Sequence, residues 1–456
     1  MIVLSNIMNN IKKALTLFGA GLFCIVVNAQ QKNSFKFDFC VDAAATGYTA
    51  VTPQTIYTDA DGFGFIATAD IRAVTRNYKN SITSDFITSS KPFLFSVKVP
   101  EGNYDVKVIL GDVNGTSATT VRAECRRLFL QNIKTKNSEI KTLSFTVHVK
   151  DSIIRDATGT AIDKVRLKER ELNYYHWDNQ LTIEFNDTAA KICAVEIIPN
   201  TKATTIFLAG NSTVVDQDKE PWASWGQMIP AFFEAKNICV ANYAESGEAL
   251  NSFKSAKRLQ KILSLMRAGD YLFIEFGHND QKQKGEGIGP FTSYKTSLKY
   301  FIGEVKKKGG IPVLVTSMHR RNFDSTGHIN NTLGDYPEAV RQAAKEENVA
   351  LIDLNAMSKI MYEAWGPERS VKAFVHYPAN SFPNQTKKLE DNTHFNTYGA
   401  YEIARCIVQA IKDNKLPIAK YLKKNIKPFN PAQPDAVENW YWPQSILQAA
   451  VKPDGN

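Results

Sequence analysis

Three short stretches, far apart in the chain, carry side chains that together could cleave an ester. Ser212 and Asn279 each follow an apolar run typical of a buried strand. His394 lies three residues after Asp391, just before the last long helical pattern. A hydroxyl nucleophile, an amide that donates to a developing oxyanion, and an imidazole base oriented by a carboxylate are the parts of serine-dependent acyl transfer. The three stretches together therefore predict such a site.

The proposed nucleophile also has an ordinary structural explanation. Ser212 could cap the helix or loop that follows it, as serine often does. Taken alone, the residue favours the cap, but the other two stretches favour the nucleophile. The residues around Ser212 do not form the G-x-S-x-G elbow, which disfavours an α/β-hydrolase. As a nucleophile, Ser212 would pass its proton to His394, while Asp391 would hold the imidazole tautomer.

The elements that must position these side chains begin near residue 204, where apolar strands start to alternate with helical patterns. Continuous apolar strands between helices predict a parallel sheet covered on both faces. The carboxyl ends of such strands lie at one edge, where ligands bind, so Ser212 and Asn279 should meet there. The predicted strands are 204–209, 238–243, 270–276, 311–316 and 350–353, and the predicted helices are 224–234, 256–267, 291–308 and 336–347.

The last part of the site follows a long stretch, 366–393, that shows no regular pattern. Its Pro- and Asn-containing run at 378–384 predicts a loop. Long loops inside a compact domain are usually functional or disordered. We expect this loop to bring Asp391 and His394 to the start of the final predicted helix, 397–413.

The first part of the chain, from about 35 to 199, has an all-β pattern. Apolar and polar side chains alternate in runs such as 93–99, 104–110 and 143–149. Turns rich in Gly, Pro and Asn separate these runs. Period-two runs of this kind predict an antiparallel β-sandwich.

The chain is predicted to be multidomain, because its 456 residues exceed one ordinary domain. Its start has the basic, apolar and small-residue regions of a secretion signal, which predicts a secreted or periplasmic protein. A signal anchor that stays attached is the alternative. No other stretch approaches a membrane span, so no membrane insertion is expected after cleavage. The predicted parts are the signal peptide (1–29), a β-sandwich (30–200), a catalytic α/β domain (201–420) and a C-terminal extension packing on the fold (421–456).

Charge and cysteine content narrow the range of partners. Loss of two lysines with the signal lowers the formal net charge from +9 to +7, a mild balance that suits an acidic polymer outside the cell. There is no basic arm typical of nucleic-acid binding, no zinc-ligand spacing and no phosphate or dinucleotide motif, so neither nucleic acid, metal nor other cofactor is expected.

Five cysteines would remain after loss of the signal. At least one thiol is therefore unpaired, and a bridge between Cys40 and Cys193 is an open alternative. The sequence does not indicate an oligomeric state.

These motifs together resemble the SGNH (GDSL-like) hydrolase superfamily, over about 204–412. The Gly-Asn-Ser-Thr stretch at 210–213 is similar to the first block, with Asn where Asp is commoner. Later blocks are matched by 242–247, by 277–280 and by the pair Asp391 and His394. Within the superfamily, three stretches look most like the rhamnogalacturonan acetylesterases: 277–280, 316–321 and 391–396.

The resemblance implies a three-layer, flavodoxin-like catalytic domain and a secreted esterase that removes O-acetyl groups from pectin, above all from rhamnogalacturonan. It implies an acetyl-Ser212 intermediate and no cofactor. It also implies an oxyanion hole formed by the backbone N–H groups of Ser212 and Gly247 with the side chain of Asn279. An ordinary turn glycine is the alternative for Gly247. The sandwich resembles the galactose-binding-like modules often joined to polysaccharide enzymes.

Other functions stay open at this point. The same chemistry could act on another acetylated glycan, such as xylan, or on a lipid. A carbohydrate-binding protein could keep the fold without turnover, although it would have no need of the full set of site residues.

Further polar residues follow the predicted strand 311–316, at the same sheet edge. His319 and Arg320 are candidate substrate contacts, because a guanidinium pairs well with a galacturonate carboxylate. A solvated loop is the equal alternative. His278, next to Asn279, is expected to support the site rather than to touch substrate.

Overall fold

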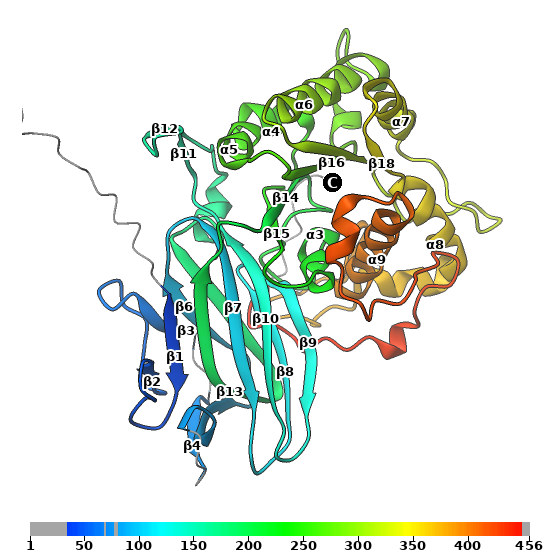
Figure 1. Ribbon diagram of the computed structural model, residues 1–456. Coiled ribbons are helices and arrows are strands. Elements are labelled where there is room, and N and C mark those ends of the chain that lie inside the picture. The colour runs from blue at the N-terminus through cyan, green and yellow to red at the C-terminus, as the bar shows by residue number, and fades with distance from the viewer. Residues whose placement is uncertain (1–33, 68–69, 77–80, 449–456) are drawn as a thin grey trace, which may run out of the picture. The chain divides into compact units, whose positions relative to one another are not determined.

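Residues 34–67, 70–76 and 81–448 are described by the computed structural model (Figure 1). The predicted signal peptide at 1–29 lies outside these residues. Within them, no helix is both long and apolar enough to cross a membrane. The five cysteines of the described part are buried and free, so Cys40 and Cys193 do not form the bridge that the sequence left open.

The N-terminal part is a β-sandwich, as the alternating pattern predicts (Figure 1). Its strands are β1 (Phe35–Phe39), β2 (Thr49–Val51), β3 (Phe63–Ala67), β4 (Arg72–Thr75), β5 (Asp85–Ser89), β6 (Phe93–Lys98), β7 (Gly102–Gly111), β8 (Ser117–Ala123), β9 (Arg127–Thr135), β10 (Ile140–Val149) and β13 (Gln180–Pro199), with the short helix α2 (Ser81–Ser84) and the small hairpin of β11 (Ile153–Arg155) and β12 (Ala161–Lys164). The long strand β13 belongs to both sheets, because it pairs antiparallel with β1, β5 and β7 in one and with β6 and β8 in the other. Buried rings such as Phe37, Phe95 and Phe185 fill the space between the sheets.

From residue 204 the chain forms a three-layer α/β fold, which confirms the predicted fold class. The five parallel strands, in spatial order, are β18 (Ala350–Ile352), β17 (Ile311–Val315), β16 (Tyr271–Glu275), β14 (Thr204–Gly210) and β15 (Ile238–Asn242). Side chains of β14 alternate between two cores, with Ile206 and Leu208 in one and Phe207 and Ala209 in the other. Because helices cover both faces, the strands appear in the sequence as continuous apolar runs.

Helices form the outer layers on the two faces of this sheet (Figure 1). The face with Ile206 is covered by α3 (Trp225–Met228), α8 (Leu354–Arg369) and α9 (Thr397–Asp413). The opposite face is covered by α4 (Leu250–Ser255), α5 (Arg258–Leu265), α6 (Lys295–Lys307) and α7 (Tyr336–Glu347). Both α7 and α9 have the bounds that the sequence predicts.

Two predicted helices differ from those in the structure. The prediction 224–234 corresponds to α3 followed by a 3-10 helix, Ile229–Phe232. Pro230 has no N–H to donate to the preceding turn, so the α-helix does not continue through it. The prediction 256–267 corresponds to α5, which begins only at Arg258, after Lys257, whose φ is 63°. Helix α4, which ends at Ser255, was not predicted.

Two further helices also differ from the prediction. The prediction 291–308 begins as a π-helical turn, Pro290–Tyr294, so α6 itself is shorter. Helix α8 was not predicted. It contains Gly366 with a φ of 72°, followed by Pro367, and this kink interrupts the helical pattern in the sequence.

The largest correction concerns the stretch 366–393, which the sequence predicts to be an irregular loop. After the end of α8, it contains most of an antiparallel pair of strands, β19 (Phe374–Tyr377) and β20 (Leu389–Phe395). Asp391 and His394 therefore lie on a strand, and the prediction that they lie in an irregular stretch is wrong. The loop predicted at 378–384 is present, between the two strands. The exposed Glu390 and Asn392 alternate with the buried residues of β20, so the strand lacks a continuous apolar run.

The β-sandwich and the α/β fold share one continuous sheet. Strand β10 pairs in parallel with β15 through Val147 and Val240. The buried Arg127 donates to the carbonyl oxygens of Val240 at 3.1 Å and His148 at 2.6 Å. Its Nε also lies 3.4 Å from the carboxylate of Asp216. The sandwich thus supports the α/β fold through buried polar groups as well as through strand pairing.

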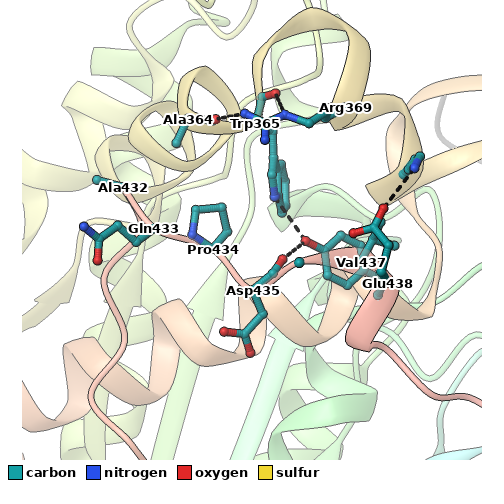
Figure 2. A pocket seen from close by; sticks show the side chains of 12 residues that line it. Ala364, Trp365, Arg369, Ala432, Gln433, Pro434, Asp435, Val437 and Glu438 are labelled. Carbon is teal, nitrogen blue, oxygen red and sulfur yellow. Dashed lines mark hydrogen bonds and ion pairs between the residues drawn. The ribbon is translucent and has the colours of Figure 1, made fainter.

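The C-terminal segment packs on both parts of the fold. Trp442 donates to Glu220 at 2.7 Å, and its ring lies 3.8 Å from the guanidinium of Arg122 in the sandwich. Earlier in the same segment, the carbonyl of Asp435 accepts from Tyr398 of α9, beside a pocket between α8, α9 and the segment (Figure 2). Aromatic and polar contacts therefore anchor the segment at several points.

Candidate active site

Ser212 lies in a tight turn directly after β14. The carbonyl of Asn211 accepts from the N–H groups of Val214 and Val215, both at 3.0 Å, and its side chain accepts from the N–H of Thr213 at 3.0 Å. No helix begins at this turn, since the next one is α3. Ser212 is therefore not a helix cap.

The structure brings Ser212, His394 and Asp391 into one chain of hydrogen bonds. Ser212 Oγ lies 2.7 Å from His394 Nε2, and His394 Nδ1 lies 2.7 Å from Asp391 Oδ2. All three residues are buried. This is the arrangement by which an imidazole can accept a hydroxyl proton while a carboxylate holds its tautomer.

The environment of Asp391 keeps its carboxyl ionised. Burial alone would raise the pKa of Asp391, but the hydrogen bond and charge interaction with His394 hold that pKa well below its usual range. The other oxygen, Oδ1, accepts from the backbone N–H groups of Thr393 at 2.9 Å and His394 at 3.1 Å. The carboxylate thus stays negative opposite the imidazole.

Neighbouring segments hold β20 on each side of His394. Arg321 donates its backbone N–H to the Asn392 carbonyl at 2.8 Å and a guanidinium N–H to the Asn392 side chain at 3.0 Å. Phe395 accepts from the N–H of Ala223 at 2.9 Å. Because other elements hold the residues on both sides of His394, β20 keeps the His394 ring in a fixed position.

The three predicted oxyanion donors lie on loops that are hydrogen-bonded to one another. Gly247 has a φ of 81°, a conformation that favours glycine. Its loop is linked to the Ser212 turn, because the Glu245 N–H donates to the Gly210 carbonyl at 3.2 Å. It is linked to Asn279 as well, whose Nδ2 donates to the Glu248 carbonyl at 3.0 Å.

These donors keep N–H groups available for a ligand. Within residues 34–67, 70–76 and 81–448, the backbone N–H groups of Ser212 and Gly247 have no acceptor. The amide of Asn279 uses one of its two N–H groups on Glu248. Such groups are suited to stabilise an oxyanion.

Two buried carboxyls that the sequence analysis did not assign support these loops. Glu275 accepts from Trp225 Nε1 at 2.8 Å and from the Thr213 hydroxyl at 3.2 Å. Asp280 accepts from the backbone N–H groups of Gly277 and Leu250, both at 2.9 Å. Burial raises the pKa of Glu275 to about 7 and that of Asp280 to about 6. A charged residue at the end of an apolar strand was the sequence signal for Glu275.

The raised pKa of Glu275 predicts a pH-dependent stability. Its pKa is about 7 in the folded chain against an ordinary 4.5, so folding favours the protonated acid. Its contribution to stability is therefore complete below pH 4.5 and is lost as the pH rises through about 7, at about 1.4 kcal/mol per pH unit. Denaturant unfolding between about pH 5 and 8 should show a smaller loss of stability for Glu275→Gln than for the wild type. Equal losses in the two proteins would contradict this assignment.

The remaining predicted site residues are held by protein contacts. His319 is buried, its backbone N–H donates to Ser358 at 3.0 Å, and burial lowers its pKa to about 4, so its ring is neutral. The half-buried Arg320 donates to the His278 carbonyl at 3.3 Å and to Thr332 at 3.4 Å. A substrate contact by His319 or Arg320 stays a prediction. His278 is itself buried at the site.

Two family models match the chain. The model for the beta-agarase/YXIM esterase-like, galactose-binding domain-like family matches residues 35–153. The model for the GDSL-like lipase/acylhydrolase family matches residues 208–400. The matches therefore cover most of the sandwich and the part of the α/β fold that contains the candidate site.

Several proteins of Bacillus subtilis (strain 168) are similar to this chain. Rhamnogalacturonan acetylesterase RhgT is 43% identical over 223 residues, which are 48% of this chain and 95% of that protein. Probable rhamnogalacturonan acetylesterase YesY is 35% identical over 225 residues, 49% of this chain and 99% of that protein. The uncharacterized esterase YxiM is 26% identical over 395 residues, 85% of this chain and 92% of that protein.

Proposed function

The chain belongs to the GDSL-like lipase/acylhydrolase family and is an esterase, and from this we propose that it removes O-acetyl groups from a polysaccharide through an acetyl-Ser212 intermediate. The observation that carries the proposal is the hydrogen-bonded chain from Ser212 through His394 to Asp391. Ser212 directly follows a strand of the parallel sheet, at the edge where such sheets bind ligands.

The geometry supports a two-step reaction. In the first step, Ser212 Oγ attacks the acetyl carbonyl carbon while His394 Nε2 takes the hydroxyl proton. The bond to the sugar oxygen then breaks, and His394 returns the proton to that oxygen. In the second step, His394 Nε2 takes a proton from the water that attacks the acetyl-Ser212 ester, and then passes this proton to Ser212 Oγ as the acyl bond breaks and acetic acid leaves. Asp391 stabilises the imidazolium in both steps.

The oxyanion of each tetrahedral intermediate needs fixed donors. We assign this role to the backbone N–H groups of Ser212 and Gly247 and to the free N–H of the Asn279 side chain. Donors that are already in place need no reorganisation during the reaction, and losing one typically slows kcat by about 10²- to 10³-fold.

The proposed substrate is acetylated rhamnogalacturonan, an acidic polymer. Support comes from two similar proteins that are named as a rhamnogalacturonan acetylesterase and a probable one. The formal net charge of +7 that remains after loss of residues 1–29 also favours association with an acidic polymer. We include export directed by residues 1–29 in the proposal, because it would bring the enzyme to a substrate outside the cell.

Acetate release by the full-length chain tests the proposal. We expect the highest kcat/KM on acetylated rhamnogalacturonan, a lower value on acetylated xylan, and the lowest on a long-chain acyl ester. Each polymer after alkaline deacetylation serves as the control for background acetate.

The relative rates on these substrates distinguish a wrong choice of polymer from a wrong assignment of the reaction. A higher kcat/KM on acetylated xylan would contradict the proposed polymer and leave the acetylesterase chemistry in place. A preference for the long-chain ester would contradict the carbohydrate substrate. Binding of acetylated polymer without any acetate release would contradict the whole proposal and favour a carbohydrate-binding protein.

A further inference from the structure

Two cationic side chains from the sandwich lie against the residues 245–248, which we call the Gly247 loop. Arg170 Nη2 donates to the carbonyl oxygen of Ser246 at 2.9 Å. Lys168 Nζ donates to the same oxygen. One backbone oxygen of the loop thus accepts hydrogen bonds from two cations.

Buried carboxylates of the same loop hold both cations in place. Arg170 Nη2 lies 2.6 Å from Glu245 Oε1, and Lys168 Nζ lies 3.1 Å from Glu248 Oε1. The cationic side chains are each 31% exposed, whereas the side chains of Glu245 and Glu248 are 1% and 4% exposed. Ion pairs that are largely shielded from water are less screened than surface pairs.

The segment that carries the cations is anchored in the interior. It is the 3-10 helix Glu169–Asn173 with the residue before it. Glu171 of this helix forms an ion pair at 2.5 Å with Arg258 of α5, and both side chains are fully buried. Glu171 also accepts from the backbone N–H of Lys168 at 2.8 Å. Lys168 and Arg170 therefore reach the Gly247 loop from a fixed base.

The Ser246 oxygen belongs to the same peptide group as the Gly247 N–H. In a planar trans peptide the two groups point in opposite directions, so holding the oxygen also sets the direction of the N–H. Charge-assisted hydrogen bonds to the oxygen also polarise the peptide and strengthen its N–H as a donor. In the described part of the chain, this N–H has no acceptor.

We propose that Lys168 and Arg170 are positioning residues of the esterase, which orient and polarise the Ser246–Gly247 peptide as an oxyanion donor. The inference rests on the proposed function, because it needs the oxyanion to form beside Ser212. It assigns the sandwich a part in the chemistry: the residues that set one donor of the hydrolase site belong to the N-terminal part of the chain.

The test compares variants of the full-length chain on 4-nitrophenyl acetate, a small neutral ester. We expect the double variant Lys168→Met with Arg170→Met to lower kcat by about 10- to 100-fold, less than complete loss of an oxyanion donor, with KM changed by less than about 3-fold. A boronic acid that forms a tetrahedral adduct with Ser212 should bind more weakly by a similar factor. The charge-keeping variants Lys168→Arg and Arg170→Lys should retain most of kcat.

Asp163→Asn is the matched control. It removes another ion pair between the sandwich and the hydrolase part, Asp163 with Lys257, in which the side chains are 28% and 29% exposed. This pair does not contact the Gly247 loop in the described structure, so kcat and boronic acid binding should not change. If the double variant fails to fold, the single variants Lys168→Met and Arg170→Met are measured instead. Each is expected to lower kcat by about 3- to 10-fold.

Two outcomes would overturn the inference. One is an unchanged kcat and unchanged boronic acid binding in the folded double or single variants. The other is a higher KM on acidic polymer with an unchanged kcat on 4-nitrophenyl acetate, which would make the two cations substrate contacts instead. Failure of the acyl-enzyme chemistry on which the inference rests is distinguishable, because the wild-type chain would then not hydrolyse 4-nitrophenyl acetate.

Discussion

Ser212→Ala is expected to lower kcat for acetyl ester hydrolysis by a factor on the order of 10⁴ to 10⁶. The substitution removes the only atom of Ser212 that can form the acyl-enzyme, while the oxyanion donors remain and account for the residual rate. The substitution removes the hydrogen bond from the hydroxyl to His394, at 2.7 Å, and leaves the backbone of the turn unchanged. The stability of the folded chain should therefore change little. Initial rates of acetate release and the thermal midpoint of unfolding measure the two effects.

Ser325→Ala is the matched control, because Ser325 is exposed on a loop outside the site. This variant should keep full activity. Mass spectrometry of the wild type, quenched during turnover, should show one added acetyl group on the peptide with Ser212, and Ser212→Ala should not. A Ser212→Ala variant that is folded and within about 10-fold of wild-type kcat would exclude Ser212 as the nucleophile.

Asp391→Asn is expected to lower kcat by about 10⁴-fold with the fold retained. The carboxylate Oδ2 accepts from His394 Nδ1 at 2.7 Å, and an amide N–H in its place would donate to that nitrogen. The imidazole would then carry its proton on Nε2, where it cannot accept the proton of Ser212. The remaining oxygen of the asparagine can still accept from the backbone of Thr393 at 2.9 Å, so β20 should keep its shape.

The same substitution has a predicted effect on stability. Because the pKa of Asp391 is lowered in the folded chain from its ordinary 3.8, its ionised form contributes stability above that pH, and the contribution is lost as the pH falls through the lowered pKa. The D391N variant should therefore be less stable than the wild type at neutral pH, and the difference should shrink in acid. Glu390→Gln is the control on the same strand, since Glu390 is exposed. A kcat loss below about 10-fold in D391N would contradict the role of Asp391.

The α/β fold could be predicted because each of its elements leaves a local pattern. The strand β14 has a continuous apolar run from Ile206 to Ala209, since helices cover both faces of the sheet. Helices α7 and α9 have one buried face each, so their bounds follow from the periodicity. Because the carboxyl ends of the parallel strands lie at one edge of the sheet, Ser212 and Asn279 are expected at the same edge.

Other elements could not be predicted, because they form through contacts with residues that are far away in the sequence. The polar strand β20 exists because it pairs with β19 and is held by Arg321 and Ala223 from other segments. The break at Gly366 hides α8 from a periodicity argument. The ion pairs of Lys168 and Arg170 with the Gly247 loop join polar residues far apart in sequence, and such pairs produce no periodic signal.

The residue types of the site and the layers of the fold follow from the amino-acid sequence, because side-chain chemistry and hydrophobic periodicity are local properties. The hydrogen bond between Ser212 and His394, which are 182 residues apart, is visible only in the folded chain. The same holds for the contacts by which the β-sandwich holds the peptide group before Gly247. These contacts form only when the folded chain brings distant segments together, and their geometry depends on the packing of every element between them.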